Sequence, residues 1–366
     1  MGSIYAIGTG LIDIEVMISD DQFRQLATTM DLQKGARLLV SAEQQKRILQ
    51  TFLPRLPANF DLIALRQALQ MGQGNISNGG SSANTMAVYC ALGGNGHLAI
   101  SLADDEYGQF FREQLAAMNV LLNPTDALVN ASASNAINIA SDIDSRHTGI
   151  CLVLITADGQ RTLLTDLGVA KALTPQHVDW QALAQADGLF LEGYLMAEAR
   201  LFAIAETAID HCRAANQKII LSTSDPSITR DHQTQLMQIL AKGVNVLFCN
   251  QTEARLLSHQ DSLDRARAAL AAQVELLIIT AGSEGAYLNH GDHDIHIPSA
   301  AITALNTNGA GDSFAGAFLY AWQHGQALDQ CLHFANEIGG LCVKLAGPHP
   351  GKRQLQTLKN RQSWSQ

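Results

Sequence analysis

The 366-residue sequence has few aromatic residues and few charged ones, at 5% and 16% of the chain. With so few aromatic rings, no single residue stands out as a stacking surface for a flat ligand. The net charge of -10 argues against a nucleic-acid-binding protein, because such proteins present a basic surface. An acidic chain can still hold a small anion through local backbone amides.

No apolar run reaches the roughly 18 residues needed to cross a bilayer, and the chain opens on a strand pattern without the basic segment of an export signal. The six cysteines are scattered, with no C-x-x-C pair and no histidine cluster at metal-ligand spacing. We therefore expect a cytoplasmic protein with reduced, mostly buried thiols, and we expect no membrane partner and no zinc site. No G-x-G-x-x-G follows the first strand, which argues against a dinucleotide-binding oxidoreductase.

The sequence does contain a regular alternation of apolar and amphipathic segments. Strands are expected at 4–7, 136–139, 150–155, 161–164, 188–191, 218–221, 244–249 and 276–280, and helices at 42–52, 201–214 and 263–272 among others. This alternation predicts a mostly parallel sheet with helices on both faces. Ligands of such sheets collect at the carboxyl ends of the strands.

The stretch from Asn306 to Phe314 joins a turn of small residues to a helical apolar pattern. The first N–H groups of a helix have no internal partner and carry the positive end of its dipole, so this geometry suits a phosphate. Asp312 stands at the junction of turn and helix. It could cap the helix or accept a proton from a bound group, and the sequence leaves both interpretations open.

Three other segments could bind ligands or could be ordinary structural elements. Residues 72–85 form a Gly- and Ser-rich stretch that runs into a small-residue helix and could be a capped loop. Asn250 and Glu253 have the spacing of a capping box after an expected strand. Asp13 alternates with isoleucines and could be a solvent-facing strand acid. The segment from Gly351 onward is basic and is expected to be a frayed tail.

The stretch Asn306-Thr307-Asn308-Gly309-Ala310-Gly311-Asp312 resembles D-T-x-G-A-G-D, the C-terminal signature of the ribokinase family, also called the PfkB sugar and nucleoside kinases. Gly79-Gly80, Asn84 and Leu92-Gly93-Gly94 resemble its N-terminal signature. The resemblance implies an α/β protein, with a three-layer α/β/α sandwich, a mostly parallel central sheet and a small β-rich lid. We expect one catalytic domain over 1–366, with a lid from about 11–75 and 125–168 and a tail at 351–366.

The resemblance also implies roles for particular residues. Asp312 would be the catalytic base, and the amides of Gly309, Ala310 and Gly311 would bind the transferred phosphoryl group. The substrate would contact Asp13, Gly79, Gly80 and Asn84. The nucleotide would contact Thr280, Gly282 and Gly285 of a T-x-G-x-x-G loop, and Asn336. Asn250 and Glu253 would serve Mg²⁺.

The implied activity is transfer of the γ-phosphoryl group of ATP to a primary hydroxyl. Asn308 resembles the adenosine-kinase branch, so adenosine is the first expected acceptor, followed by inosine or guanosine and then by ribose or fructose. Asn306 departs from the signature where the family has an Asp near a monovalent-cation site, which puts activation by K⁺ in doubt. A non-catalytic sugar or nucleotide sensor is the alternative of another class. We expect a monomer or a homodimer.

Overall fold

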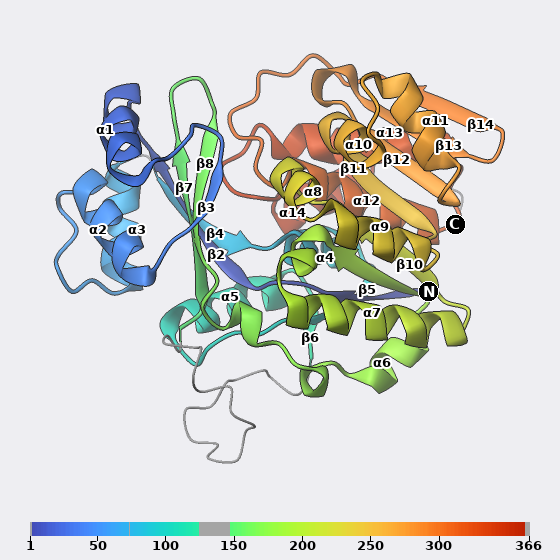
Figure 1. Cartoon of the computed structure of the whole chain (residues 1–366), viewed down its shortest axis with the longest axis horizontal. Helices are drawn as coiled ribbons and strands as arrows, with labels where there is room; N and C mark the ends of the chain where they lie inside the picture. Colours follow the sequence, from blue (N-terminus) through green and yellow to red (C-terminus); the bar gives the residue numbers. More distant parts are fainter. Residues whose placement is uncertain (1, 73, 124–146, 363–366) are drawn as a thin grey trace.

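The computed structural model describes residues 2–72, 74–123 and 147–362 (Figure 1). The strand expected at 136–139 lies outside these described residues, as do residue 73 and residues 125–146 of the expected lid. The remaining lid segments are described. Two β-sheets organise the chain, a large one flanked by helices and a small one that carries its own helices on one side.

The large sheet has nine strands in the order β14-β13-β12-β11-β10-β9-β1-β5-β6. All neighbours are parallel except β12-β13 and β13-β14, which are antiparallel at one edge. The strands are β1 Ser3–Ile7, β5 Asn95–Ala99, β6 Leu121–Leu122, β9 Gly188–Glu192, β10 Lys218–Ser222, β11 Val246–Asn250, β12 Leu276–Thr280, β13 Ala286–His290 and β14 His293–Ile297. The expected mostly parallel sheet is confirmed.

Helices cover both faces of this sheet because its strands are apolar on both sides. Along β10, Ile220 packs into one core cluster, while Ile219 and Leu221 pack into the other. One face carries α4 Ser81–Ala91, α5 Glu106–Ala117, α12 Ala310–Gln323, α13 Leu328–Cys342 and α14 Lys352–Lys359; the other carries α6 Trp180–Gln185, α7 Ala199–Ala214, α9 Gln233–Ala241, α10 Gln251–Ser258 and α11 Leu263–Ala271. A further helix, α8 Pro226–Asp231, follows β10.

The small sheet, called the lid sheet below, has the order β3-β8-β7-β2-β4. Its strands are β2 Leu11–Met17, β3 Arg37–Leu39, β4 Asn75–Gly79, β7 Gly149–Ile155 and β8 Arg161–Asp166, and its helices are α1 Asp20–Met30, α2 Ala42–Phe52 and α3 Leu62–Met71. The predicted helix at 42–52 and the hairpin of β7 and β8 are confirmed.

The two faces of the lid sheet differ because side chains of a strand alternate. Ile12 and Ile14 on β2 are fully buried against the lid helices, in the same core cluster as Phe23 of α1 and Ile48 of α2. Between them, Asp13 points the other way, into the space between the two sheets. The predicted alternation is therefore confirmed, and Asp13 is a cavity residue and not a surface acid.

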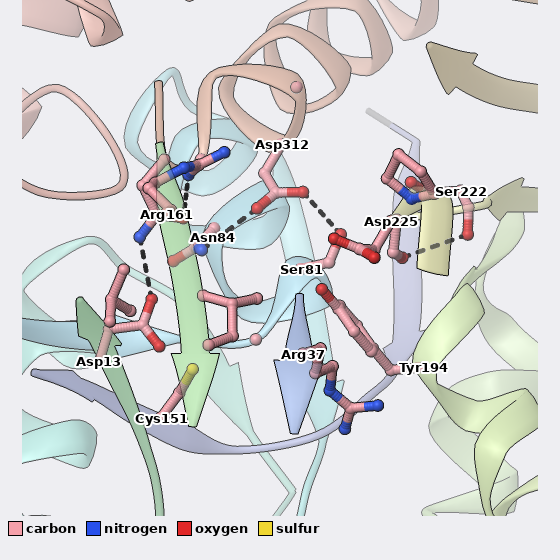
Figure 2. A pocket seen from close by; sticks show the side chains of 18 of the residues that line it. Asp13, Arg37, Ser81, Asn84, Cys151, Arg161, Tyr194, Ser222, Asp225 and Asp312 are labelled. Atoms are coloured by element: carbon pink, nitrogen blue, oxygen red, sulfur yellow. Dashed lines mark hydrogen bonds between the residues drawn. The ribbon is translucent and has the colours of Figure 1, made fainter. Parts of the chain in front are cut away.

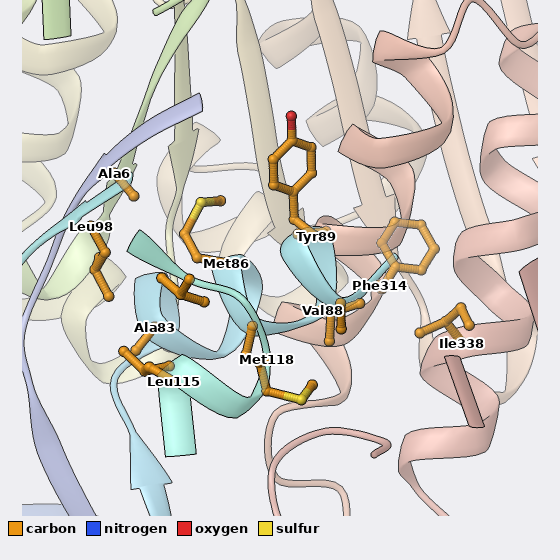
Figure 3. Packing of buried hydrophobic residues seen from close by; sticks show 14 of the residues in the cluster. Ala6, Ala83, Met86, Val88, Tyr89, Leu98, Leu115, Met118, Phe314 and Ile338 are labelled. Atoms are coloured by element: carbon orange, nitrogen blue, oxygen red, sulfur yellow. The ribbon is translucent and has the colours of Figure 1, made fainter. Parts of the chain in front are cut away.

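Helices α4 and α12 pack closely on one face of the large sheet (Figure 3). Met86, Val88 and Phe314 are buried between them and the neighbouring elements. At the closest point, a Cβ on Gly316 would lie 2.4 Å from the backbone oxygen of Thr85. Since Gly316 lies about one turn after Asp312 and Thr85 directly follows Asn84, this contact places the first turns of the two helices side by side.

The segment from 351 differs from the expected frayed tail. Residues Lys352–Lys359 form α14, and Leu355 is fully buried in the main core cluster. Gln356 donates to the carbonyl of Ala91, and Lys359 donates to the carbonyl of Leu92 at 2.7 Å. The basic residues misled the interpretation, because this Lys binds the carbonyls at the end of α4 instead of solvent.

All six cysteines lie within the described ranges, where they are buried and form no disulfide, as predicted. Across these ranges, no helix is both long enough and apolar enough to span a membrane.

We expect Gly316→Ala to lower the free energy of unfolding by about 1–3 kcal/mol, because the added methyl group forces the backbones of α4 and α12 apart. Helix propensity alone would favour alanine by up to about 1 kcal/mol. Gly340→Ala in α13 is the matched control, since its Cβ meets only the end of the Ile302 side chain. Urea unfolding of both variants measures the difference, and equal stabilities would contradict the close contact.

Candidate active site

A cavity of about 570 Å³ lies between the lid sheet and the carboxyl ends of the large sheet's parallel strands. Thr9 follows β1, Glu253 follows β11 and Thr280 ends β12, while the lid sheet contributes its inner face. Figure 2 shows Asp13, Asn84, Ser81 and Asp312 around one part of this cavity, with Arg37 and Tyr194 on another side. The sequence motifs therefore converge at the sheet edge where the topology predicts a ligand.

The turn before α12 is shaped by Gly309, which has φ +68° and lies against the carbonyl of Pro348. A Cβ there would lie 1.9 Å from that oxygen, so only glycine fits. The N–H groups of Gly311 and Asp312 have no acceptor within the part of the chain that the structure describes. No atom lies within 4 Å of the point where a Gly311 Cβ would be, so space for an anion exists beside these amides.

Asp312 is partly buried and is held by two neutral donors from α4. Ser81 Oγ donates to its Oδ1 at 2.6 Å, and Asn84 Nδ2 donates to its Oδ2 at 3.2 Å. Burial raises the pKa of Asp312, and the two hydrogen bonds lower it in part. Asn84, predicted to bind the substrate, thus contacts the predicted base, and Ser81 was missed. Only the packing of α4 on α12 reveals either contact.

Asp13 lies on the inner face of the lid sheet and accepts a hydrogen bond from Asn308 Nδ2 at 3.0 Å. Arg161 Nη1 in turn donates to Asn308 Oδ1 at 3.1 Å. Burial, reinforced by the nearby Glu15 carboxylate and opposed in part by the hydrogen bond from Asn308, raises the pKa of Asp13 to about 7. Sequence reasoning gave Arg161 no role, although it lies in the D-G-x-R-T segment of the lid hairpin.

Asn306, the departure from the family signature, contacts an acid on the lid sheet. Its Oδ1 accepts from the backbone N–H of Asn308 at 2.9 Å, and its Nδ2 donates to Glu15 Oε1 at 2.8 Å. Glu15 is 4% exposed and accepts a second hydrogen bond from Asn308 Nδ2 at 3.3 Å. The Asn306 amide therefore holds the turn and gives the buried Glu15 carboxylate a hydrogen-bond donor. Because the amide is uncharged, it does not neutralise the charge of that carboxylate.

The two predicted substrate-binding glycines are required by contacts within the protein. A Cβ on Gly79 would lie 2.1 Å from Asp13 Oδ1, and one on Gly80, which has φ +90°, would lie 2.1 Å from the Thr9 carbonyl oxygen. Gly80 also lines the cavity, whereas Gly79 lies behind Asp13. A third buried acid, Glu192, accepts from Thr9 N at 2.8 Å and Ser82 N at 2.6 Å, which ties the loop after β1 to the start of α4.

The predicted nucleotide contacts are only partly brought together. Thr280 lines the cavity, but Gly282, Gly285 and Asn336 do not. Asn336 Nδ2 donates to the Ile297 carbonyl at 2.9 Å, and a Cβ on Gly285 would lie 2.0 Å from that same oxygen. Asn336 therefore holds the end of β14, and Gly285 leaves room for it. These contacts explain both residues without a bound nucleotide.

Asn250 and Glu253 form the predicted capping box at the start of α10. Glu253 Oε2 also accepts from Thr223 Oγ1 at 2.5 Å. Burial, together with the charges of Asp225 and Asp312, raises the pKa of Glu253 to about 7. Asp225, which sequence reasoning missed, lies in a Ser-Asp-Pro segment after β10 and lines the same cavity.

These acids fit a hydrated cation better than a directly bound one. Among the described residues, no group of three or more His, Cys, Asp or Glu side chains could hold a metal ion. A cation near Glu253 would nevertheless offset the unfavourable burial that raises its pKa. Mg²⁺ keeps several waters and needs only one or two protein carboxylates, so this donor set suits it.

The chain resembles known kinases over most of its length. Residues 58–353 match a family model described as the pfkB family of carbohydrate kinases. The chain is 26% identical to the adenosine kinase of Saccharomyces cerevisiae over 297 residues, which are 77% of this chain and 82% of the relative. It is 26% identical to the ATP-dependent ribose-1-phosphate kinase of Halopiger xanaduensis over 278 residues, with 74% and 82% covered.

Among solved structures, the adenosine kinase from Sinorhizobium meliloti has a TM-score of 0.80 to this chain, at 23% identity and with 98% of this chain and 99% of that chain covered. At this identity the likeness concerns the fold, and it confirms the expected three-layer α/β/α architecture with a small second sheet. The resemblance drawn from the Asn306–Asp312 signature is confirmed by the family match.

We expect Asn306→Asp to lower the free energy of unfolding by about 2–4 kcal/mol at pH 8, because it places a second carboxylate beside the buried Glu15. The loss should shrink as the pH falls, since two close carboxylates can share a proton. It should also shrink in KCl relative to choline chloride, because a small cation could replace the lost N–H donor.

Chemical unfolding in the two salts measures both effects. In the Glu15→Gln background the same substitution should cost little, since an amide at 15 can donate to an acid at 306. Wild-type protein should respond equally to the two salts. A specific stabilisation of the wild type by K⁺ would show that the Asn306 amide does not stand in for a cation.

Proposed function

Because the chain belongs to the pfkB family of carbohydrate kinases, we propose that it transfers the γ-phosphoryl group of ATP to a primary hydroxyl of a nucleoside or sugar. The chain is thus a phosphotransferase, and we propose that its two sheets act as one catalytic unit. The observation that carries the proposal is the position of Asp312, beside free backbone amides and facing a cavity whose other wall holds Asp13.

In this proposal, the start of α12 binds the phosphoryl group during its transfer. Phosphoryl transfer has a loose transition state with negative charge on the equatorial oxygens, so fixed donors stabilise it most. The amides of Gly311 and Asp312 are free to donate, and those of Gly309 and Ala310 lie in the same turn. Arg161 adds a positive charge near Asp13 and Asp312, as its effect on the pKa of each carboxyl group indicates.

Asp312 would accept the proton of the attacking hydroxyl. A raised pKa improves a carboxylate as a base, provided that the group remains ionised at the working pH. Ser81 and Asn84 keep that balance, because each donates a hydrogen bond to the ionised form. Since both donors come from α4, the helix contact at Gly316 also fixes the direction of the base.

The nucleotide would lie toward the ends of β11 and β12, near Thr280 and Asn250. Mg²⁺, when bound with ATP, would offset the negative charge of the phosphate groups. Glu253 and Asn250 would orient its water ligands, and the capping box holds both side chains in place. Gly285 and Asn336 contact Ile297 outside the cavity, so we propose that they support the nucleotide loop, in which Gly282 supplies a turn at φ +57°.

Asp13 would bind the acceptor, because its carboxylate can accept hydrogen bonds from two neighbouring hydroxyls. The apolar inner face of the lid sheet, formed by Leu11, Cys151, Val153 and Leu163, could cover a flat group attached to the sugar. This favours a nucleoside over a free sugar such as ribose or fructose. By resemblance, adenosine is the first acceptor and inosine or guanosine the next.

A non-catalytic sensor of the same ligands is the alternative. Its sequence support was the Asn306 departure together with an N-terminal signature whose later part is incomplete. The Glu15 contact accounts for Asn306 without loss of the turn. Release of ADP from ATP-Mg²⁺ with a panel of nucleosides and sugars distinguishes the two, and a protein that binds acceptors without releasing ADP would be the sensor.

We expect Asp312→Asn to lower kcat by at least about 100-fold, in line with loss of a positioned general base, while the acceptor dissociation constant changes little. Steady-state ADP release and calorimetric binding measure the two quantities. Asp264→Asn, at an exposed position of α11, is the control. Full turnover by the Asp312→Asn variant would remove this residue from the mechanism.

We expect acceptor binding to tighten as the pH rises through about 7, because the pKa of Asp13 is raised to about 7 and only its ionised form accepts two hydroxyl donors. Binding measured without ATP from pH 5.5 to 8.5 avoids the contribution of the chemical step. Asp13→Asn should weaken binding and flatten the profile. A pH-independent wild type would show that the sugar does not bind at Asp13.

A further inference from the structure

Arg37 begins β3 and lines the cavity, yet its guanidinium group has no hydrogen-bond acceptor among the described residues. Its carbon Cζ lies 5.4 Å from the centre of the Tyr194 ring. Across residues 2–72, 74–123 and 147–362, its side chain makes no hydrogen bond and no ion pair. Stacking on a ring leaves the N–H groups at the edge of the guanidinium free, so Arg37 offers a plane of donors with no acceptor.

Nearby carboxylates are already engaged. Asp231 is bound by Arg230 through contacts of 2.8 and 3.3 Å. Asp225 caps α8 by accepting from Ser227 N at 2.7 Å. Neither contacts Arg37, whose donors therefore remain free at the wall of the cavity.

The strand register places Arg37 at the far end of one continuous surface from Asp13. Asp13 lies opposite Cys151, Cys151 lies opposite Thr165, and Leu163, on the same side of β8, lies opposite Arg37. Three strand spacings of about 4.8 Å, combined with the two-residue offset of about 6.6 Å along the strand, separate the two backbone positions by about 16 Å. The middle is apolar, since Cys151 and Val153 form a buried cluster with Leu163 and Leu11 packed against it.

On this surface, Asp13 can accept hydrogen bonds from sugar hydroxyls, the apolar centre can pack on the face of a base, and Arg37 can donate hydrogen bonds to the edge of that base. A 6-oxopurine presents two acceptors, N7 and O6, on one edge and is a good bidentate partner of arginine. Adenine presents N7 and an amino donor there, and a guanidinium has no acceptor to meet that amino group. Arginine thus suits a 6-oxopurine and disfavours adenine.

We propose that Arg37 selects the base of the acceptor and that this kinase prefers a 6-oxopurine nucleoside, inosine or guanosine, over adenosine. The inference rests on the proposed kinase function and reverses the order of acceptors that the resemblance suggests. A phosphate on the acceptor could also bind a guanidinium, and one relative is named a ribose-1-phosphate kinase. A sugar phosphate would leave the apolar centre uncovered, so the base is favoured.

The test compares kcat/KM for inosine, guanosine and adenosine at saturating ATP-Mg²⁺. A bidentate arginine contact gives discrimination of about 5- to 150-fold, and the wild type should prefer the 6-oxopurines by a factor in this range. Arg37→Met, which keeps much of the side-chain length but removes every donor, should reduce that preference to within about 3-fold. Arg24→Met, at an exposed position of α1, should leave it unchanged.

A second arm changes the ligand in place of the protein. For the wild type, 7-deazaguanosine should bind about 5-fold or more weakly than guanosine, because one acceptor of the bidentate pair is missing. For Arg37→Met the two should bind alike. Arg37→Lys, which keeps the charge without the planar pair of donors, should also lose most of the preference.

Several results would overturn the inference. These are a wild type that prefers adenosine, a base preference that Arg37→Met leaves intact, and a sugar phosphate that outcompetes nucleosides and loses that advantage in Arg37→Met. If the kinase proposal itself fails, the result is different, because the protein would then release no ADP from ATP with any acceptor. The nucleoside affinities measured by calorimetry without ATP would still decide whether Arg37 reads the base.

Discussion

The burial of acidic side chains between the lid sheet and the carboxyl ends of the large sheet's strands is the constraint on which the rest of the structure depends. Asp13, Glu15, Glu192 and Glu253 are each at most 7% exposed, and a buried carboxylate is costly unless donors satisfy it. Here the donors are mostly neutral, namely the hydroxyls of Thr9 and Thr223, the amides of Asn306 and Asn308, and backbone N–H groups. The turn before α12 and the start of α4 both supply such donors to these acids.

Neutral donors leave the negative charge in place. The pKa values of Asp13 and Glu253 are raised to about 7, which means that the site gains free energy from any cation or proton that enters it. A kinase uses this property, because its nucleotide arrives with Mg²⁺ and its acceptor hydroxyl must lose a proton. The same charge would repel the nucleotide phosphates, and Arg161 with the amides of α12 provides the opposing attraction.

The two sheets contribute to the cavity in different ways. The parallel sheet is buried on both faces, so its strand ends present a rigid row of loops and helix starts. The lid sheet packs one face on its helices and turns the other toward the cavity, so a single position such as Arg37 can change the cavity wall without altering the core. The groups proposed for catalysis lie on the first sheet's side, and the groups proposed to select the acceptor lie mainly on the second.

Much of the fold could be read from the sequence, because it depends on local patterns. The apolar strands, the helix at 42–52 and the turn before α12 were predicted from periodicity and glycine chemistry, and the structure agrees. The basic segment from 351 was predicted wrongly, since Lys359 binds the carbonyl of Leu92 at the end of α4, 267 residues earlier in the chain. Contacts of this kind leave no local pattern.

The sequence by itself determined the family, the sheet and the positions of Asp13 and Asp312, because each is encoded within a short stretch whose backbone geometry is set by its own residues. Only the tertiary structure decided what those residues touch. It assigned Asn84 and Ser81 to Asp312, paired Asn306 with Glu15, and removed Asn336 and Gly285 from the cavity. It also placed Arg37 opposite Asp13 on one surface. The physical reason is that hydrogen bonds and packing between distant segments depend on helix approach and strand register, which the complete core fixes and no single stretch contains.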